Sequence, residues 1–289
     1  MSQFRKAKID DKKQIDEILN YCQCPSLEYN FTTLFLWQDI FNMEFKIEND
    51  ILFVRSGKDK KSYLFPCGKG NIDKAVNEIL KERVRFHSLS EENKTYLEEK
   101  YPGRFEFFER RDDGDYVYKR ESLATLTGKK LSAKRNHINR FISENPDWNY
   151  EEITDSNILE VKNMHEKWCE VVDDGTKKGL SDETAVVKRA LEYYDELKLS
   201  GGLIRAGGEV VAFSLGDRLN DKTFLVHIEK AFAEITGAYQ IINREFVLHN
   251  CMDYEFVNRE DDTGDENLRK AKLSYRPVEI VKKYVAKER

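Results

Sequence analysis

The sequence is poor in the residues that break, kink or cross-link a chain. Only 5 of its 289 residues are proline and 15 are glycine, while 40% are hydrophobic, and this composition excludes disordered, collagen-like and low-complexity proteins. The five cysteines are scattered and lack the spacing of a zinc site, so we expect reduced thiols and no metal. No apolar run approaches the roughly 18 residues that span a bilayer, which predicts a cytoplasmic protein without an integral membrane segment.

An excess of one charge is also missing. The chain has 48 basic and 53 acidic residues, which gives a net charge of −5. This balance excludes a constitutive duplex-DNA binder, because such a protein usually has a basic surplus. The exception is local, since residues 122–143 contain five basic side chains and no acidic one.

Hydrophobic periodicity predicts the same order of elements in both halves of the chain. Each half shows a strand, two helices, three strands, a helix, a strand, a helix and a final strand. In the first half we expect a strand at 4–9 and a hairpin formed by 105–108 and 116–118. In the second half we expect 278–284 to be the last strand.

This repeated order predicts an α/β (α+β) protein built from two similar modules, each with a mixed central sheet flanked by helices. The first module covers residues 1–122 and the second covers 147–289. A basic connector helix at 123–146 joins them.

Several short strings carry a resemblance to a known family. They include Asp-Tyr-Val-Tyr-Lys-Arg-Glu at 115–121, Gly-Lys-Lys-Leu-Ser-Ala-Lys-Arg-Asn-His-Ile-Asn-Arg-Phe at 128–141, Val-His-Ile-Glu-Lys at 226–230, Asn-Arg-Glu-Asp-Asp at 258–262 and Leu-Arg-Lys-Ala-Lys-Leu-Ser-Tyr at 268–275. Together they resemble the C-terminal domain of the phosphatidylglycerol lysyltransferases, a GNAT-like acyltransferase family related to the Fem-type aminoacyltransferases. The lipid-modifying members have a long transmembrane region before this domain. The present sequence lacks one and resembles the soluble, stand-alone members.

The resemblance implies a tandem duplication of two GNAT-like modules, with the active site in the second. It implies transfer of an activated acyl group from aminoacyl-tRNA or acyl-CoA to an amine or hydroxyl acceptor, a small molecule or a peptide. Direct attack on the acyl carbonyl needs positioning and charge stabilisation, and neither a metal nor a tightly bound cofactor. A second hypothesis stays open: a catalytically inert module that binds a peptide, a metabolite or tRNA.

The loop that cradles the pyrophosphate of acetyl-CoA in GNAT proteins is degenerate here. The family pattern Gln/Arg-x-x-Gly-x-Gly/Ala corresponds to residues 234–239, where only Gly237 is kept. Glu234 places a carboxylate where the phosphates would lie, and Tyr239 replaces a small residue. Gly237 and Tyr239 are candidate donor-binding residues, and a simple helix-start role for Gly237 is the alternative.

The connector helix supplies two further candidates, Lys134 and Arg135, which flank its apolar face. One interpretation is contact with the phosphates of a tRNA acceptor stem or a cofactor. The other is a solvated amphipathic helix whose basic side chains extend over the core.

The catalytic candidates lie near the end of the strand predicted at 223–228 and on the helix that follows it. Alternation places His227 and Glu229 on one face, where His227 can act as general base. Glu245 falls on the apolar stripe of helix 238–249, and a buried carboxylate there needs a cation, for which His249 and Lys272 are the candidates. The remaining candidates for substrate or donor binding lie in the strings that carry the resemblance, and they are Lys230, Arg259, Lys272 and Tyr275.

Overall fold

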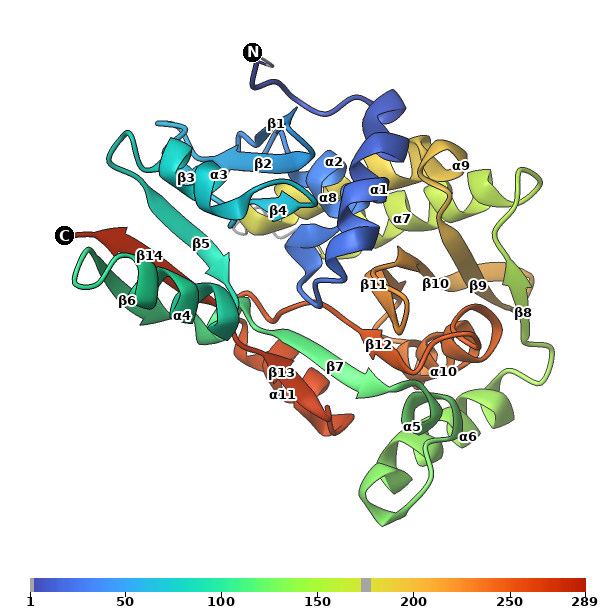
Figure 1. Cartoon of the computed structure of the whole chain (residues 1–289). Helices are drawn as coiled ribbons and strands as arrows, with labels where there is room; N and C mark the ends of the chain where they lie inside the picture. The colour runs from blue at the N-terminus through green and yellow to red at the C-terminus, as the bar shows by residue number, and fades with distance from the viewer. Residues whose placement is uncertain (1–2, 173–177) are drawn as a thin grey trace.

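The computed structural model describes residues 3–172 and 178–289 and contains two seven-stranded mixed sheets flanked by helices (Figure 1). The predicted α/β architecture, with two mixed sheets flanked by helices, is confirmed. The first sheet consists of β1 (Glu44–Glu48), β2 (Ile51–Ser56), β3 (Ser62–Tyr63), β4 (Cys67–Gly68), β5 (Arg85–Leu89), β6 (Phe105–Glu109) and β14 (Tyr284–Glu288). The second consists of β7 (Asp115–Lys119), β8 (Asn149–Glu152), β9 (Ser200–Ala206), β10 (Glu209–Arg218), β11 (Thr223–Ala231), β12 (Phe256–Asn258) and β13 (Glu279–Val281).

Helices cover both sheets. The first half contributes α1 (Lys12–Cys22), α2 (Phe31–Trp37), α3 (Ile72–Ile79), α4 (Glu91–Lys100) and the short 3-10 helix η2 (Leu27–Tyr29). The connector contributes α5 (Arg120–Thr125), the 3-10 turn η4 (Lys129–Leu131) and α6 (Ser132–Glu144). The second half contributes α7 (Ile158–Val172), α8 (Lys178–Glu192), α9 (Tyr194–Leu197), α10 (Ala238–Asn250) and α11 (Glu266–Ser274).

The two sheets have matching topologies. The first has the order β1-β2-β3-β5-β14-β6, with β4 also paired to β2, and the second has the order β8-β9-β10-β11-β12-β7-β13. Among the described strands, each sheet has a single parallel pair, β3 with β5 and β11 with β12. The corresponding positions of these pairs support the duplication that the repeated element order predicts.

Each sheet takes one strand from the other predicted module. Strand β7 belongs to the first half of the chain but lies between β12 and β13 in the second sheet. Strand β14 ends the chain but lies between β5 and β6 in the first sheet. A boundary at residue 122 therefore does not separate the two sheets.

This exchange corrects two predicted elements. The hairpin expected from 105–108 and 116–118 does not form, because β6 and β7 lie in different sheets. The single strand expected at 278–284 is divided into β13 and β14, which also lie in different sheets. Alternation of apolar residues identifies a strand but contains no information about its partner. The strand expected at 4–9 is reduced to one bridge between Arg5 and Phe45, followed by a 3-10 turn.

A buried ion cluster fixes the place where the exchanged strands cross. The Lys283 ammonium lies 2.5 Å from Asp115 Oδ1 and 2.8 Å from Glu28 Oε2, and the Lys283 side chain is 1% exposed. Asp115, the first residue of β7, also accepts hydrogen bonds from Leu27 N at 2.8 Å and Asn258 Nδ2 at 3.0 Å. Burial lowers the pKa of Lys283, but attraction to the two carboxylates outweighs it and raises the pKa well above its usual range.

The modules also share a hydrophobic core. One cluster of buried side chains joins Leu34 and Phe35 of the first half to Val187 and Phe213 of the second. Phe35 packs edge-to-face on Tyr193, with ring centroids 5.1 Å apart. Within the described residues, no helix is both long enough and apolar enough to cross a membrane.

Candidate functional site

The parallel strands of the second sheet, β11 and β12, stay paired over only three residues each. β11 and β12 pair from Thr223 with Phe256 to Leu225 with Asn258. Beyond that point β11 continues along β10 to Ala231, while β12 ends at Asn258. Side chains from β11, α10, α11 and α6 meet the residue that follows β12.

An ion pair between Glu229 and Arg259 lies beyond the point where the two strands stop pairing. The Glu229 carboxylate accepts hydrogen bonds from Arg259 Nη2 at 2.7 Å and Asn243 Nδ2 at 2.9 Å. The Arg259 guanidinium carbon lies 4.8 Å from the centre of the Tyr275 ring, and the Lys134 ammonium lies 4.1 Å from the same centre. The fold therefore brings together four predicted site residues from four separate segments: Lys134, Glu229, Arg259 and Tyr275. Together with Asn243 they form what we call the Glu229 cluster.

Polar atoms in this cluster lack partners. Asn243 Oδ1 and Arg259 Nη1 are buried and make no hydrogen bond. In the part of the chain that the structure describes, no carboxylate or hydrogen-bond acceptor contacts the Lys134 ammonium. Because buried polar groups are nearly always satisfied, one unused acceptor and two cations beside a carboxylate are typical of a ligand site.

The surroundings stabilise the charged form of Arg259 but destabilise the charged form of Lys134. Burial and the nearby Arg259 guanidinium lower the pKa of Lys134, which Glu229 only partly offsets. Burial also lowers the pKa of Arg259, but its ion pair with Glu229 outweighs this and keeps it raised. Burial raises the pKa of the Tyr275 hydroxyl, so that group stays protonated.

Lys272 holds the backbone of the segment that carries Arg259. Its ammonium donates to the backbone carbonyls of Arg259, at 2.6 Å, and of Asp261. Burial lowers the pKa of Lys272. These contacts fix the turn that follows β12 and so position the Arg259 side chain.

His227 lies between two carboxylates. Its Nδ1 is 3.0 Å from Glu260 Oε1 and its Nε2 is 3.1 Å from Asp217 Oδ1, and its side chain is 4% exposed. Burial lowers the pKa of His227, but attraction to both carboxylates outweighs it and raises the pKa to about 9. The ring is therefore an imidazolium at neutral pH, with both nitrogens used as donors. This geometry argues against the general-base role predicted for His227.

The His227 ion pairs make stability depend on pH. A raised folded pKa means that the contribution is complete below 6.5, the unfolded value, and is lost as the pH rises through about 9. Integrated over that interval, the effect is on the order of 3 kcal/mol. Urea unfolding of the parent and of His227→Gln at intervals from pH 6 to 10 measures it. We expect the difference between the two proteins to shrink across this range, and a constant difference would contradict the assignment.

The start of α10 explains Gly237. Its φ is +87°, and a Cβ there would lie 2.3 Å from the His137 carbonyl oxygen of α6. Glycine is thus required by the backbone conformation and by close packing on α6. This contact favours the helix-start role over a phosphate cradle.

Lys230 follows Glu229 on β11, and Tyr239 lies in the first turn of α10, where the charge of Glu229 acts on its hydroxyl. The Lys230 ammonium is 2.5 Å from Glu183 Oε1 and 4.1 Å from the centre of the Trp168 ring. Burial raises the pKa of Tyr239. The Lys230 side chain is engaged with α7 and α8, so it does not add to the group around Arg259.

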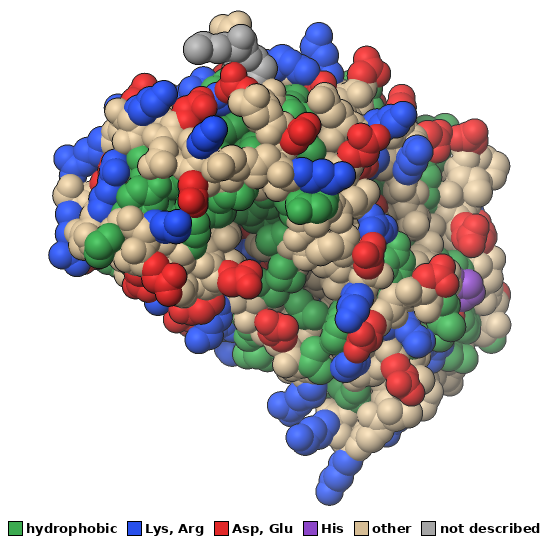
Figure 2. All heavy atoms as spheres, viewed as in Figure 1, with side chains coloured by type: hydrophobic (Ala, Val, Ile, Leu, Met, Phe, Trp, Pro, Cys, Tyr) green, Lys and Arg blue, Asp and Glu red, His purple; other side chains and the backbone are tan. Residues whose placement is uncertain are grey.

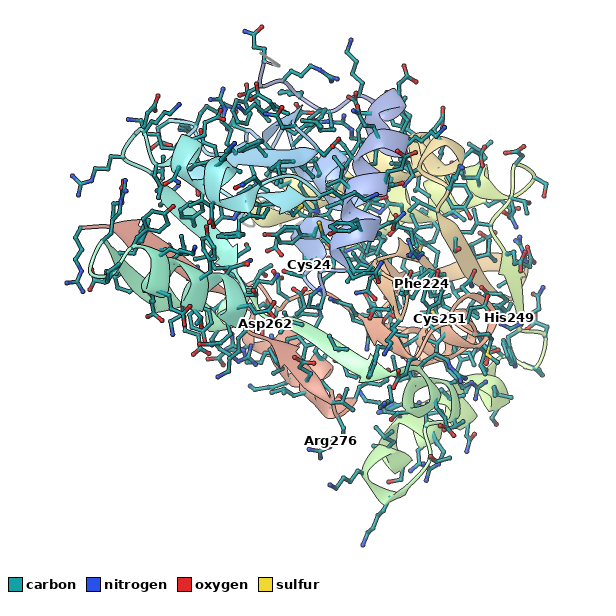
Figure 3. All side chains as sticks on the ribbon, viewed as in Figure 1. Cys24, Phe224, His249, Cys251, Asp262 and Arg276 are labelled. Atoms are coloured by element: carbon teal, nitrogen blue, oxygen red, sulfur yellow. The ribbon has the colours of Figure 1, made fainter. Side chains whose placement is uncertain are left out.

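Two other candidates have structural partners elsewhere. Glu245 pairs with Arg244, with Nη2 and Oε1 2.5 Å apart, so the predicted partners His249 and Lys272 were wrong. His249 instead hydrogen-bonds the backbone carbonyl of Glu245 at 2.8 Å. Arg135 donates to the carbonyl of Gly128 at 2.8 Å and closes the end of α5. In Figure 3, His249 lies well away from Asp262. Since Asp262 is only three residues after Arg259, His249 does not belong to the group around Arg259.

Sequence reasoning missed Asn243 as a site residue. It is 1% exposed and lies on α10, facing β11. A buried amide within an apolar helix was the available signal. Asn243 becomes a site residue because its side chain contacts Glu229, and only the folded structure places the two residues opposite each other.

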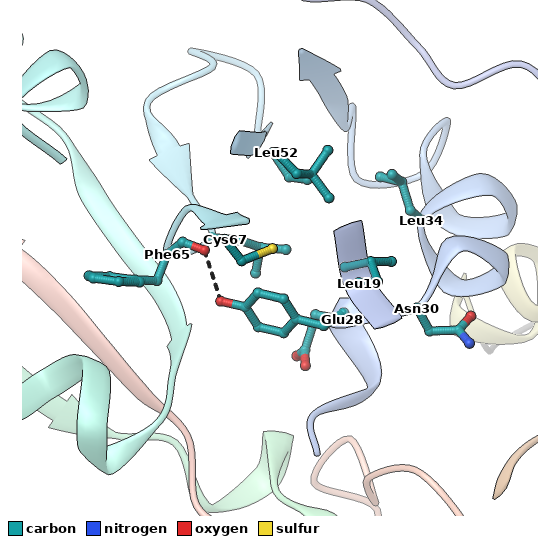
Figure 4. A pocket seen from close by; sticks show the side chains of 10 residues that line it. Leu19, Glu28, Asn30, Leu34, Leu52, Phe65 and Cys67 are labelled. Atoms are coloured by element: carbon teal, nitrogen blue, oxygen red, sulfur yellow. Dashed lines mark hydrogen bonds between the residues drawn. The ribbon is translucent and has the colours of Figure 1, made fainter. Parts of the chain in front are cut away.

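The equivalent region of the first sheet is filled. Tyr29 of η2 is buried and donates to the Phe65 carbonyl at 3.0 Å, beside the residues that follow β3. The remaining cavity, about 10 Å³, has room for a single water molecule and is lined mainly by apolar side chains such as Leu34 and Leu52 (Figure 4). The unpartnered polar atoms described above therefore make the second module the location of the candidate site.

Comparison with known proteins agrees with this architecture. A crystal structure of a conserved protein of unknown function from Bacteroides thetaiotaomicron is 35% identical, covers 100% of both chains and superposes with a TM-score of 0.94. A C-terminal domain assigned to a lysylphosphatidylglycerol synthetase from Agrobacterium fabrum has the same fold, with a TM-score of 0.67 at 13% identity, over 97% of this chain and 92% of that one. An uncharacterised protein of Mycoplasmoides gallisepticum is 25% identical over 186 residues, 60% of this chain and only 56% of that protein.

The family comparison covers nearly the whole chain. The family described as phosphatidylglycerol lysyltransferase, C-terminal, matches residues 24–287. The match includes both sheets, the exchanged strand β7 and every residue of the Glu229 cluster. The chain belongs to the phosphatidylglycerol lysyltransferase C-terminal family.

Proposed function

We propose that this protein is an aminoacyltransferase that moves an aminoacyl group from tRNA to an amine or hydroxyl acceptor. The observation that carries the proposal is the Glu229 carboxylate held between Arg259 and Asn243, with Asn243 Oδ1 and Arg259 Nη1 still unused. Membership of a transferase family supports the reaction class.

An aminoacyl group fits these polar atoms better than a simple acyl group does. Its ammonium can bond to Glu229 and to Asn243 Oδ1, and its carbonyl oxygen can face Arg259 and Lys134. An acetyl group has no ammonium and would leave the buried Asn243 Oδ1 without a partner, which costs a site much of its affinity. The close packing of Gly237 on His137 also argues against a CoA pyrophosphate at the start of α10.

The chemistry follows from the same residues. The acceptor nitrogen or oxygen attacks the ester carbonyl, a new bond to the acyl carbon forms, and the bond to the tRNA 3′-terminal oxygen breaks. Arg259 and Lys134 stabilise the negative charge that develops on the carbonyl oxygen. Glu229 is the carboxylate available to receive the proton that the acceptor loses, and that proton then passes to the departing tRNA oxygen, which leaves as a hydroxyl group.

A basic tip next to the cluster offers a surface for tRNA phosphates. Lys129, Lys130 and Arg276 are exposed, and within the described chain none of them pairs with a carboxylate. Figure 2 shows Lys and Arg side chains gathered at the lower end of the molecule, where the turn before α6 and the end of α11 lie. Arg276 directly follows Tyr275, so this basic tip adjoins the site.

Aminoacyl-tRNA turnover tests the proposal. With the cognate charged tRNA and an amine acceptor, Glu229→Gln should reduce the rate by about 100-fold or more without weakening tRNA binding. The double variant Lys129→Glu, Lys130→Glu should weaken tRNA binding and flatten its log–log salt dependence by about 1.4 to 2 units. Loss of the aminoacyl group from tRNA and filter binding at several salt concentrations are the measurements.

A matched reversal on the opposite module, Lys13→Glu with Lys74→Glu, should leave both properties unchanged, because these exposed lysines lie on α1 and α3. A folded parent that neither binds tRNA at low salt nor consumes any aminoacyl-tRNA would reject the proposal and favour the inert binding module. Turnover of acyl-CoA and not of aminoacyl-tRNA would show that acyl-CoA is the donor.

A further inference from the structure

We propose that Lys134 is a nucleophilic amine and a site of direct acylation by small activated acyl compounds, namely acyl phosphates and thioesters. The proposal concerns the reactivity of this side chain and does not require tRNA or an acceptor. It assigns to Lys134 a covalent modification, whereas the transfer reaction above uses it only as a cation.

The position of Lys134 isolates its ammonium from the groups that normally hold a lysine charged. Lys134 lies in the first turn of α6, partly exposed, with its nitrogen 4.1 Å from the centre of the Tyr275 ring. Within the residues that the structure places, its nitrogen has no carboxylate and no hydrogen-bond acceptor as a partner. The ring attracts the cation but cannot take its proton.

The nearby charges oppose this attraction overall, because the repulsion from Arg259 exceeds what Glu229 offsets. The Arg259 guanidinium lies against the same ring, 4.8 Å from its centre, and repels a second positive charge. The Glu229 carboxylate is already engaged by Arg259 and Asn243, so it offsets this repulsion only in part. Burial together with Arg259 lowers the pKa of Lys134. A desolvated lysine beside another cation is the arrangement that makes an amine nucleophilic near neutral pH.

The step is a simple acyl substitution. The neutral amine attacks the acyl carbonyl, a carbon–nitrogen bond forms, and the bond to the phosphate oxygen or the thiolate sulfur breaks. The nitrogen loses one proton to solvent, and the leaving group departs as phosphate or thiolate, so nothing is oxidised or reduced. The unused Arg259 Nη1 can donate to the carbonyl oxygen as it becomes negative.

Acylation removes one of the two cations beside the Tyr275 ring. The neutral amide loses the electrostatic attraction to the ring and can no longer face a carbonyl oxygen as a cation. Acylation at this position therefore acts on the same cluster that the proposed transfer reaction uses.

Acetyl phosphate provides the test. The full chain is incubated with it at pH 7.5, and acetylation of each lysine is followed over time by peptide mass spectrometry. Lys129 and Lys130 are the internal controls, because they are exposed and lie only five and four positions before Lys134, respectively. We expect an initial rate at Lys134 at least about threefold above theirs. The preference should disappear in denaturant, where the surroundings of the three lysines become alike.

Two variants make the outcome specific. Lys134→Arg should remove this adduct and leave the rates at Lys129 and Lys130 unchanged. Arg259→Gln removes the repelling charge and should reduce the preference for Lys134, with circular dichroism used to confirm that the variant is folded. Equal rates at the three lysines, or a preference that survives denaturation, would overturn the proposal. Because the assay contains no tRNA, its result and that of the transfer assay are independent.

Discussion

Replacing Lys283 by alanine is expected to destabilise the protein by about 3 to 5 kcal/mol, because it strands Asp115 and Glu28 as buried carboxylates without their cation. That loss is a large part of the stability of an ordinary domain. Urea unfolding at pH 7.5, followed by tryptophan fluorescence, measures it. The Asp115 carboxylate keeps its hydrogen bonds to Leu27 N and Asn258 Nδ2, but these do not neutralise its charge.

The neighbouring Lys282 provides a matched control, since it is exposed and Lys282→Ala should change stability by less than about 0.5 kcal/mol. The double variant Lys283→Met, Asp115→Asn should recover part of the loss, because it removes the cation and one carboxylate together. A change of less than about 1 kcal/mol for Lys283→Ala would contradict a stabilising role for this cluster.

Separating the two halves of the chain is expected to abolish folding of both. A fragment of residues 1–122 lacks β14, which lies between β5 and β6, so β6 loses its only strand partner in the sheet. A fragment of residues 123–289 lacks β7, which lies between β12 and β13. Each fragment also exposes its part of the core that the two halves share. Heteronuclear NMR spectra of the isolated fragments should show the poor dispersion of unfolded chains.

Co-expression of the two fragments provides the control. Together they contain every strand of both sheets, so we expect them to associate and to give a dispersed spectrum like that of the intact chain. A cooperative unfolding transition for either fragment alone would contradict the requirement for strand exchange. The full chain cut in the loop between α6 and β8 should remain folded, because that cut interrupts neither sheet.

Local sequence patterns determined which segments become helices and strands. The apolar stripe of residues 238–249 became α10, and the alternation at 223–228 became the first part of β11. These elements depend on contacts between residues that are close in sequence, and apolar periodicity records such contacts directly. The duplicated order of elements, and hence two mixed sheets, followed from the same signals.

The resemblance, rather than any local pattern, identified the segments that meet at the candidate site. Lys134, Glu229, Arg259 and Tyr275 lie in four different matching strings, and the fold places them around one ion pair. It did not distinguish these residues from Arg135, which lies next to Lys134 but holds the end of α5. The two neighbours differ only in the direction of their side chains, since Lys134 faces the Tyr275 ring and Arg135 faces the Gly128 carbonyl.

Tertiary structure alone decided the pairing of strands and charges. Strands β7 and β14 look like the last strands of their own modules, yet each completes the other sheet, because hydrogen bonding between strands does not depend on sequence distance. His227 was predicted as a possible general base, but it is an imidazolium because Asp217 and Glu260, 10 and 33 residues away, converge on its two nitrogens. The protonation state of a buried group is set by the charges packed around it, and those become known only when the chain is folded.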